Sequence, residues 1–157
     1  MPYLIDGHNL IAQTPGIQLG AVDDEAQLIR LLQAFCTRTG SRATVYFDKG
    51  QAAAPSPPSA GRVTARFVAA PRSADQAIMR HLDRLAGEAR NWTVVSSDRE
   101  VQQAASRAGA RRLGSREFAA RLLQRLARPQ AEKPSDSLSK EDVEYWERRF
   151  RHPRRRP

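Results

Sequence analysis

The sequence contains very little cysteine. Cys36 is the only one, so an internal disulfide and a Cys-rich zinc site are both excluded. Cys36 lies beside the apolar stripe of a predicted helix, and we expect it to be a small core residue and not a catalytic thiol. A composition of this kind fits a reducing compartment, so we expect a cytoplasmic protein.

Long apolar runs are also absent. No stretch approaches the roughly 20 apolar residues that span a bilayer. The first residues reach Asp6 before the apolar core of a signal peptide could form. We therefore expect a soluble protein with no membrane attachment.

Nucleotide-binding glycine motifs do not follow the first predicted strand. That strand ends in the run Asp6-Gly7-His8-Asn9, where a dinucleotide-binding fold would place G-x-G-x-x-G and a P-loop would place Gly-Lys-Ser/Thr. We therefore expect no small-molecule organic cofactor. A phosphatase of the haloacid type would need a second Asp two residues after Asp6, where this chain has His8.

Lysine is scarce and arginine is abundant. Only three of the 26 basic residues are lysines, and the net charge is +9. Eight arginines lie between Arg99 and Arg128 against two glutamates, whereas residues 1–60 carry four basic and five acidic residues. A high-GC genome, which enriches arginine in every protein that it encodes, is one explanation. The uneven distribution favours the other, a polyanionic partner such as RNA.

Four aspartates stand at the ends of predicted strands or the start of a predicted helix. Asp6 ends the apolar run 3–5, Asp48 ends 43–47, and Asp98 ends 92–97, while Asp75 lies just inside a helix that Ser73 begins. The carboxyl ends of parallel strands meet at one edge of a sheet, where open α/β folds bind their ligands. We therefore expect these four carboxylates to share one pocket.

The order of these motifs is similar to that of a known family. Asp-Gly-His-Asn, Phe-Asp, Ser-Ala-Asp and Ser-Ser-Asp together resemble the NYN domain family (YacP-like nucleases) of the PIN-like superfamily, over about residues 2–127. The resemblance implies metal-dependent endonucleolytic cleavage of RNA, including messenger RNA on the ribosome. His8 departs from the family pattern, because many relatives carry Tyr there.

Carboxylates that crowd into one pocket raise one another's pKa unless a cation balances them. Oxygen-only ligands favour a hard ion, Mg²⁺ or Mn²⁺, that keeps several waters. We expect Asp6, Asp75 and Asp98 to hold this metal directly or through water, with Asp48 as a further ligand. Asn9 is expected to orient Asp6 or a metal-bound water.

The remaining candidates have two readings each. Ser97 either binds substrate or caps the helix that runs to about Arg107, and His8 either contacts substrate or makes a structural hydrogen bond. Three arginines are candidate RNA contacts that could instead form solvated faces: Arg99, Arg121 and Arg125. The alternative to an enzyme is a non-catalytic RNA- or ribosome-binding module on the same fold.

Alternating strand and helix signals predict a three-layer α/β/α sandwich with a mainly parallel, PIN-like central sheet. Helices are expected to begin at Asp24, Ser73, Ser97 and Ser115, with an edge strand over residues 62–68 and a long loop over 49–60. We assign residues 1–128 to the nuclease domain and 129–157 to a linker, an amphipathic helix and an Arg-rich tail. The oligomeric state stays open, a homo-oligomer included.

Overall fold

The computed structural model describes residues 1–50, 58–59 and 61–128. Met1–Ala127 form one compact unit. The predicted linker, C-terminal helix and Arg-rich tail lie outside the described residues, as does most of the predicted loop 49–60. The first two residues of that loop, Lys49 and Gly50, instead continue the second strand.

A five-stranded, wholly parallel sheet forms the centre of the unit, with strand order β3-β2-β1-β4-β5. The strands are β1 (Pro2–Asp6), β2 (Arg42–Gly50), β3 (Val63–Ala69), β4 (Thr93–Val95) and β5 (Arg111–Leu113). The predicted edge position of β3 is confirmed. Because β1 lies at the centre and ends at Asp6, this carboxylate stands at the middle of the sheet's carboxyl edge.

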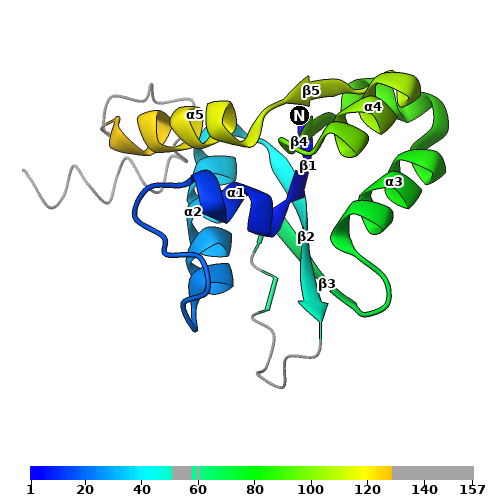
Figure 1. The fold of residues 1–157 in the computed structure, drawn as a ribbon. Coiled ribbons are helices and arrows are strands. Elements are labelled where there is room, and N and C mark those ends of the chain that lie inside the picture. Colours follow the sequence, from blue (N-terminus) through cyan, green and yellow to red (C-terminus); the bar gives the residue numbers. More distant parts are fainter. Residues whose placement is uncertain (51–57, 60, 129–157) are drawn as a thin grey trace, which may run out of the picture. The chain divides into compact units, whose positions relative to one another are not determined.

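Helices cover both faces of the sheet (Figure 1). One face carries α1 (Gly7–Gln13), α2 (Asp24–Thr39) and α5 (Ser115–Ala127), which pack on one another. The other carries α3 (Ala74–Leu85) and α4 (Arg99–Ala108), which contact each other and the 3-10 helix η1 (Ala86–Asn91). The predicted three-layer α/β/α sandwich is therefore confirmed.

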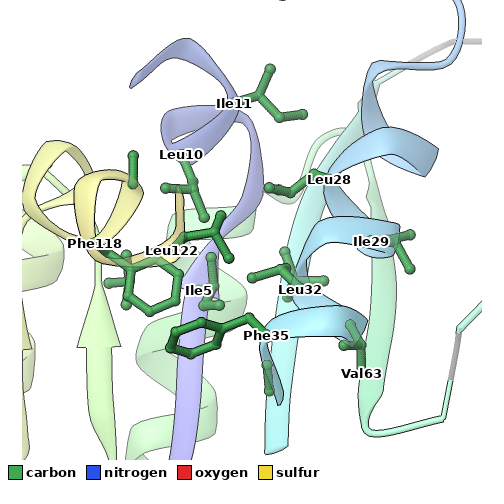
Figure 2. Close-up of a cluster of buried hydrophobic side chains, with 14 of the residues drawn as sticks. Ile5, Leu10, Ile11, Leu28, Ile29, Leu32, Phe35, Val63, Phe118 and Leu122 are labelled. Carbon is green, nitrogen blue, oxygen red and sulfur yellow. The ribbon is translucent and has the colours of Figure 1, made fainter. Parts of the chain in front are cut away.

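Two apolar cores fill the spaces between the layers, because neighbouring side chains of a strand point to opposite faces. In β1, Ile5 belongs to the core under α1, α2 and α5 (Figure 2), and Leu4 belongs to the core under α3 and α4. Both are fully buried. Cys36 lies in the first core, and burial raises the pKa of its thiol to about 11, which confirms its prediction as a core residue.

The starts of two helices, α1 and α2, differ from the expectation. The helix α1 begins directly after Asp6, where only a turn and a polar rim were predicted. The second helix is preceded by Asp23 as N-cap without a side-chain cap bond, and Asp24 instead accepts a hydrogen bond from the Gly20 N–H at 2.9 Å. The capping box at Ser73 is confirmed.

Candidate functional site

Asp6 is the buried centre of the candidate site, with 6% of its surface exposed. The Ser96 hydroxyl donates a hydrogen bond to Asp6 Oδ2 at 3.1 Å. Burial raises the pKa of Asp6 and the nearby Asp48 charge adds to this, while hydrogen bonds from Ser96, the Asn9 backbone N–H and Asp75 oppose it. The net shift is upward, so the fold places this carboxylate where its charge is poorly solvated.

Asp75 lies half-buried in the first turn of α3. Its pKa rises from 3.8 to about 6, first because of burial and then because of the charges of Asp6, Asp98 and Asp48. The contacts agree with these causes, because Asp48 bonds to the Ala74 N–H next to Asp75, and Ser96 bonds both to Asp6 and to the Asp98 N–H. The structure therefore gathers the four predicted aspartates into one acidic group, named here the carboxylate edge.

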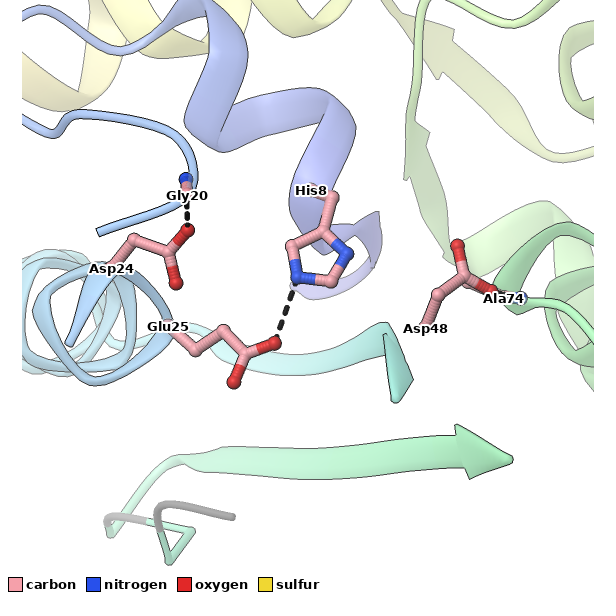
Figure 3. Close-up of polar contacts among 6 residues, drawn as sticks. All are labelled: His8, Gly20, Asp24, Glu25, Asp48 and Ala74. Atoms are coloured by element: carbon pink, nitrogen blue, oxygen red, sulfur yellow. Dashed lines mark hydrogen bonds and ion pairs between the residues drawn. The ribbon is translucent and has the colours of Figure 1, made fainter. Parts of the chain in front are cut away.

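Two members of the carboxylate edge also cap helices. Asp48 Oδ1 accepts a hydrogen bond from the Ala74 N–H at 2.6 Å, at the start of α3 (Figure 3). Asp98 Oδ1 accepts one from the Val101 N–H at 3.1 Å and is the N-cap of α4. One oxygen of each carboxylate is thus committed to a backbone N–H at a helix start.

The donor chemistry of the carboxylate edge fits a hard divalent cation. The three carboxylates whose charges raise the pKa of Asp75 leave negative charge that a cation would balance. Within residues 1–50, 58–59 and 61–128, no three acidic, His or Cys side chains form a ready metal-ligand group. Mg²⁺ is commonly held by one or two carboxylates, waters and substrate phosphates, so it does not need such a cage.

Asn9 ties three elements together behind the carboxylates. Its Oδ1 accepts hydrogen bonds from the Ser97 N–H at 2.9 Å and from the Ser115 hydroxyl, and its backbone N–H supports Asp6. The side chain therefore fixes α1 against the start of α4 and of α5. Its support of Asp6 comes from the backbone N–H, and its predicted role as an orienting residue of a metal site stays a prediction.

Ser96 is a site residue that sequence reasoning missed. It is fully buried, donates to Asp6, and accepts a hydrogen bond from the Asp98 N–H at 3.0 Å. It thus links the Asp6 carboxylate to the backbone of Asp98. Its place directly after the buried run Val94-Val95 was the available signal, because a polar residue there meets the same strand edge as Asp6.

Ser97 does not cap α4, because Asp98 does. The prediction of Ser97 as N-cap is therefore wrong by one residue. Its hydroxyl instead accepts a hydrogen bond from the Ser115 N–H at 3.2 Å and helps to start α5. Ser97 is exposed beside Asp98, so its substrate-binding role stays a prediction.

His8 makes the structural hydrogen bond that was one of its two readings. Its Nε2 lies 2.7 Å from Glu25 Oε2 on α2, and Figure 3 shows the imidazole turned toward that carboxylate. The ring also packs against Phe47, with the ring centroids 5.3 Å apart. His8 therefore braces α1 against α2 and β2.

The three candidate arginines occupy different surroundings. Arg99 is exposed and directly follows Asp98 at the start of α4. Arg121 forms an ion pair with Glu117 on the exposed side of α5. Its charge also lies close enough to Tyr3 to oppose the rise in pKa that burial causes there, and Tyr3 stands at the opposite end of β1 from Asp6. Arg125 is half-buried in the last turn of α5. Of the three, only Arg99 adjoins the carboxylate edge in sequence and structure.

The fold and the site together define a class of protein. It is an α/β sandwich with a parallel sheet, in which Asp6 ends the central strand and the other aspartates lie near it. A family model, described as the YacP-like NYN domain, matches residues 3–151. The chain belongs to this family, which is of the nuclease type. Comparison with curated proteins found no significant match.

Two solved structures of one bacterial protein are similar to this chain. The crystal structure of Rae1 (YacP) from Bacillus subtilis has a TM-score of 0.65 and 27% sequence identity, and covers 100% of this chain and 99% of that one. The crystal structure of its W164L mutant has a TM-score of 0.66 and 27% sequence identity, and the match covers 80% of this chain and 76% of that one.

In the described part of this chain, no helix is long and apolar enough to cross a membrane.

Proposed function

We propose that this protein is a metal-dependent endoribonuclease that cleaves RNA phosphodiester bonds, with messenger RNA on the ribosome as a substrate that the family resemblance suggests. The observation that carries the proposal is the carboxylate edge, in which Ser96 bonds to Asp6 and to the Asp98 N–H, and Asp48 bonds to the start of α3. Burial and then the charges of the other three aspartates raise the pKa of Asp75 there to about 6. Membership of a nuclease-type family supports it. The +9 net charge supports a polyanionic substrate.

The chain's own residues would prepare the site. Asp6 and Asp75 would hold Mg²⁺ or Mn²⁺, with Asp48 and Asp98 close by. Ser96 and Asn9 would fix Asp6 in place before substrate arrives, which limits reorganisation during the reaction. When bound, such an ion makes a coordinated water more acidic and neutralises charge on phosphate oxygens.

Asp75→Asn tests the proposal, with Asp83→Asn as the matched control on the exposed side of the same helix. We expect the parent and Asp83→Asn to cleave single-stranded or structured RNA with Mg²⁺ or Mn²⁺ and not with EDTA, and Asp75→Asn to be inactive. Mn²⁺ should also raise the thermal stability of the parent more than that of Asp75→Asn, because one ligand is missing.

A non-catalytic RNA- or ribosome-binding module is the second candidate, because the net charge of +9 would serve RNA binding equally well without cleavage. The same assay separates the two functions. Cleavage products in EDTA would rule out the metal mechanism. RNA binding without cleavage under every metal condition would identify the binding module.

A further inference from the structure

A pocket of about 640 Å³ lies between β3 and α3, on the face of the sheet that α3 covers. Four of its lining residues are arginines: Arg66 on β3, Arg72 in the loop that follows, and Arg80 and Arg84 on α3. No acidic residue of the described chain lines it. Its volume falls in the range of ligand-binding pockets.

The four arginines have exposed side chains and no carboxylate partner. Within the ranges that the structure describes, none of these four arginines takes part in an ion pair. Arg80 and Arg84 lie one helical turn apart, so they face the same side of α3. A concave surface with four unpaired guanidinium groups attracts anions, and the planar guanidinium matches the oxygens of phosphate.

This pocket adjoins the carboxylate edge. Gln76 and Ala77 line it and directly follow Asp75 along α3. From Gln76 to Arg84 the helix rises by about 12 Å. That length leaves room for more than one phosphate of an RNA strand along the pocket.

Aromatic rings in the pocket are not free to stack on bases. Tyr46 is 4% exposed and its hydroxyl lies 2.9 Å from His81 Nδ1, and Phe67 stacks on Phe47 with centroids 5.1 Å apart. Base stacking on aromatic side chains is the usual way to bind the bases of single strands. The pocket can therefore bind the phosphates of a nucleic-acid backbone, but it has no free aromatic ring on which the bases could stack.

We propose that this arginine pocket binds backbone phosphates of the RNA strand that flanks the scissile bond, without reading its sequence. The inference rests on the proposed ribonuclease function, because it assigns the pocket to the substrate of the carboxylate edge. Contacts of this kind position a nucleic acid and carry no sequence information.

The double variant Arg66→Gln/Arg80→Gln tests the pocket in an Asp75→Asn background, which separates binding from cleavage. Fluorescence anisotropy would measure the binding of a single-stranded oligouridylate across a salt series. Each phosphate contact to a single strand contributes about 0.7 to the slope of log K against log salt, so the slope should fall by about 1.4. Affinity at low salt should fall with it.

The matched control is Arg30→Gln/Arg107→Gln, which removes the same charge from exposed positions on α2 and α4 outside the pocket. We expect the control to keep most of the parent slope. Arg66→Lys/Arg80→Lys keeps the charge and should also keep the slope, which excludes misfolding as the cause. Superimposable lines for the pocket variant and the control would overturn the inference.

This outcome is distinguishable from failure of the proposed function. A parent that cleaves RNA while the two double variants bind alike would refute the pocket alone. A parent that never cleaves RNA, with a slope that still depends on the pocket, would refute the nuclease and leave phosphate binding by the pocket standing.

Discussion

Asp75 is the side chain whose protonation should be easiest to detect. Its pKa rises from 3.8 to about 6 on folding, so the folded, metal-free protein binds this proton more tightly than the unfolded chain. The stabilising contribution is complete below about pH 4 and is lost as the pH rises through about 6. Asp6 shifts in the same direction, first because it is buried.

The prediction is that metal-free parent protein loses stability relative to Asp75→Asn between about pH 4 and pH 6, and that Asp75→Asn is at least as stable as the parent at pH 7. Urea unfolding at a series of pH values measures this. His81, whose pKa burial lowers, acts in the opposite direction, but it is common to both proteins and cancels in the difference.

Asp83→Asn is the control for this pH series, since Asp83 is an exposed residue of α3. Its stability should follow the parent at every pH. Parallel curves for the parent and Asp75→Asn would show that the carboxylate edge does not perturb Asp75.

Ser96→Ala should destabilise the protein by about 1–3 kcal/mol, because it removes one partner from each of two hydrogen bonds at a fully buried position. It should also raise the pKa of Asp6 further, since the hydroxyl lowers it. Unfolding in urea and an NMR titration of Asp6 measure the two effects. Ser106→Ala, on the exposed side of α4, should change neither.

At the scale of elements, Gly7 allows the start of α1 to pack closely against β2. A Cβ added at Gly7 would run into the Phe47 ring and would lie 2.9 Å from the Tyr46 carbonyl oxygen. We expect Gly7→Ala to cost about 1–3 kcal/mol in unfolding free energy and to weaken metal binding, because the clash displaces the residue beside Asp6. Calorimetry with and without Mn²⁺ measures both.

Gly87→Ala is the control for that substitution, because a Cβ there meets nothing within 4 Å. Its stability should stay close to that of the parent. A Gly7→Ala protein as stable as Gly87→Ala would mean that α1 and β2 separate easily.

The elements themselves were largely predictable from the sequence. Apolar runs marked the strands, and their carboxyl ends marked where Asp6, Asp48 and Asp98 lie, because in a parallel sheet these ends meet at one edge. Helix starts were less certain wherever two capping residues were adjacent. The pairs Asp23-Asp24 and Ser97-Asp98 each offered two choices, and only tertiary contacts decide between them.

Contacts between distant residues were beyond the reach of sequence patterns. The helix α1 has seven residues and no side-chain cap bond, so no local signal marked it. The hydrogen bonds of Asn9 to Ser97 and Ser115 join residues that are 88 and 106 positions apart. The spacing of apolar residues along the sequence does not predict such contacts. The same is true of the arginine pocket, which β3 and α3 form only once packed.

Charge is the property that acts over the whole molecule. The terminal run Arg148 to Arg156 carries six arginines in nine residues and lies outside the described residues. Deleting residues 151–157 removes four of them, so the salt slope of RNA binding should fall by up to about 3. The cleavage pattern on short RNA should stay the same, because these residues carry no carboxylate.

Binding of Asp75→Asn with and without residues 151–157, across a salt series, measures this contribution. Replacing the four arginines by glutamine in the full-length chain is the control for lost length and should reproduce the deletion. Identical salt lines for the full and shortened proteins would show that the terminal arginines contribute nothing to RNA affinity.

The central place of β1 determines when the site can form during synthesis. Tyr3 pairs with Thr93, so β1 lacks one neighbour until β4 has left the ribosome. At about 5–20 residues per second, the synthesis of the residues between β1 and β4 takes roughly 5–20 s. During this time the cores that contain Leu4 and Ile5 are incomplete. Asp6 likewise gains its hydrogen bond from Ser96 only then. A partly synthesised chain therefore has no assembled carboxylate edge.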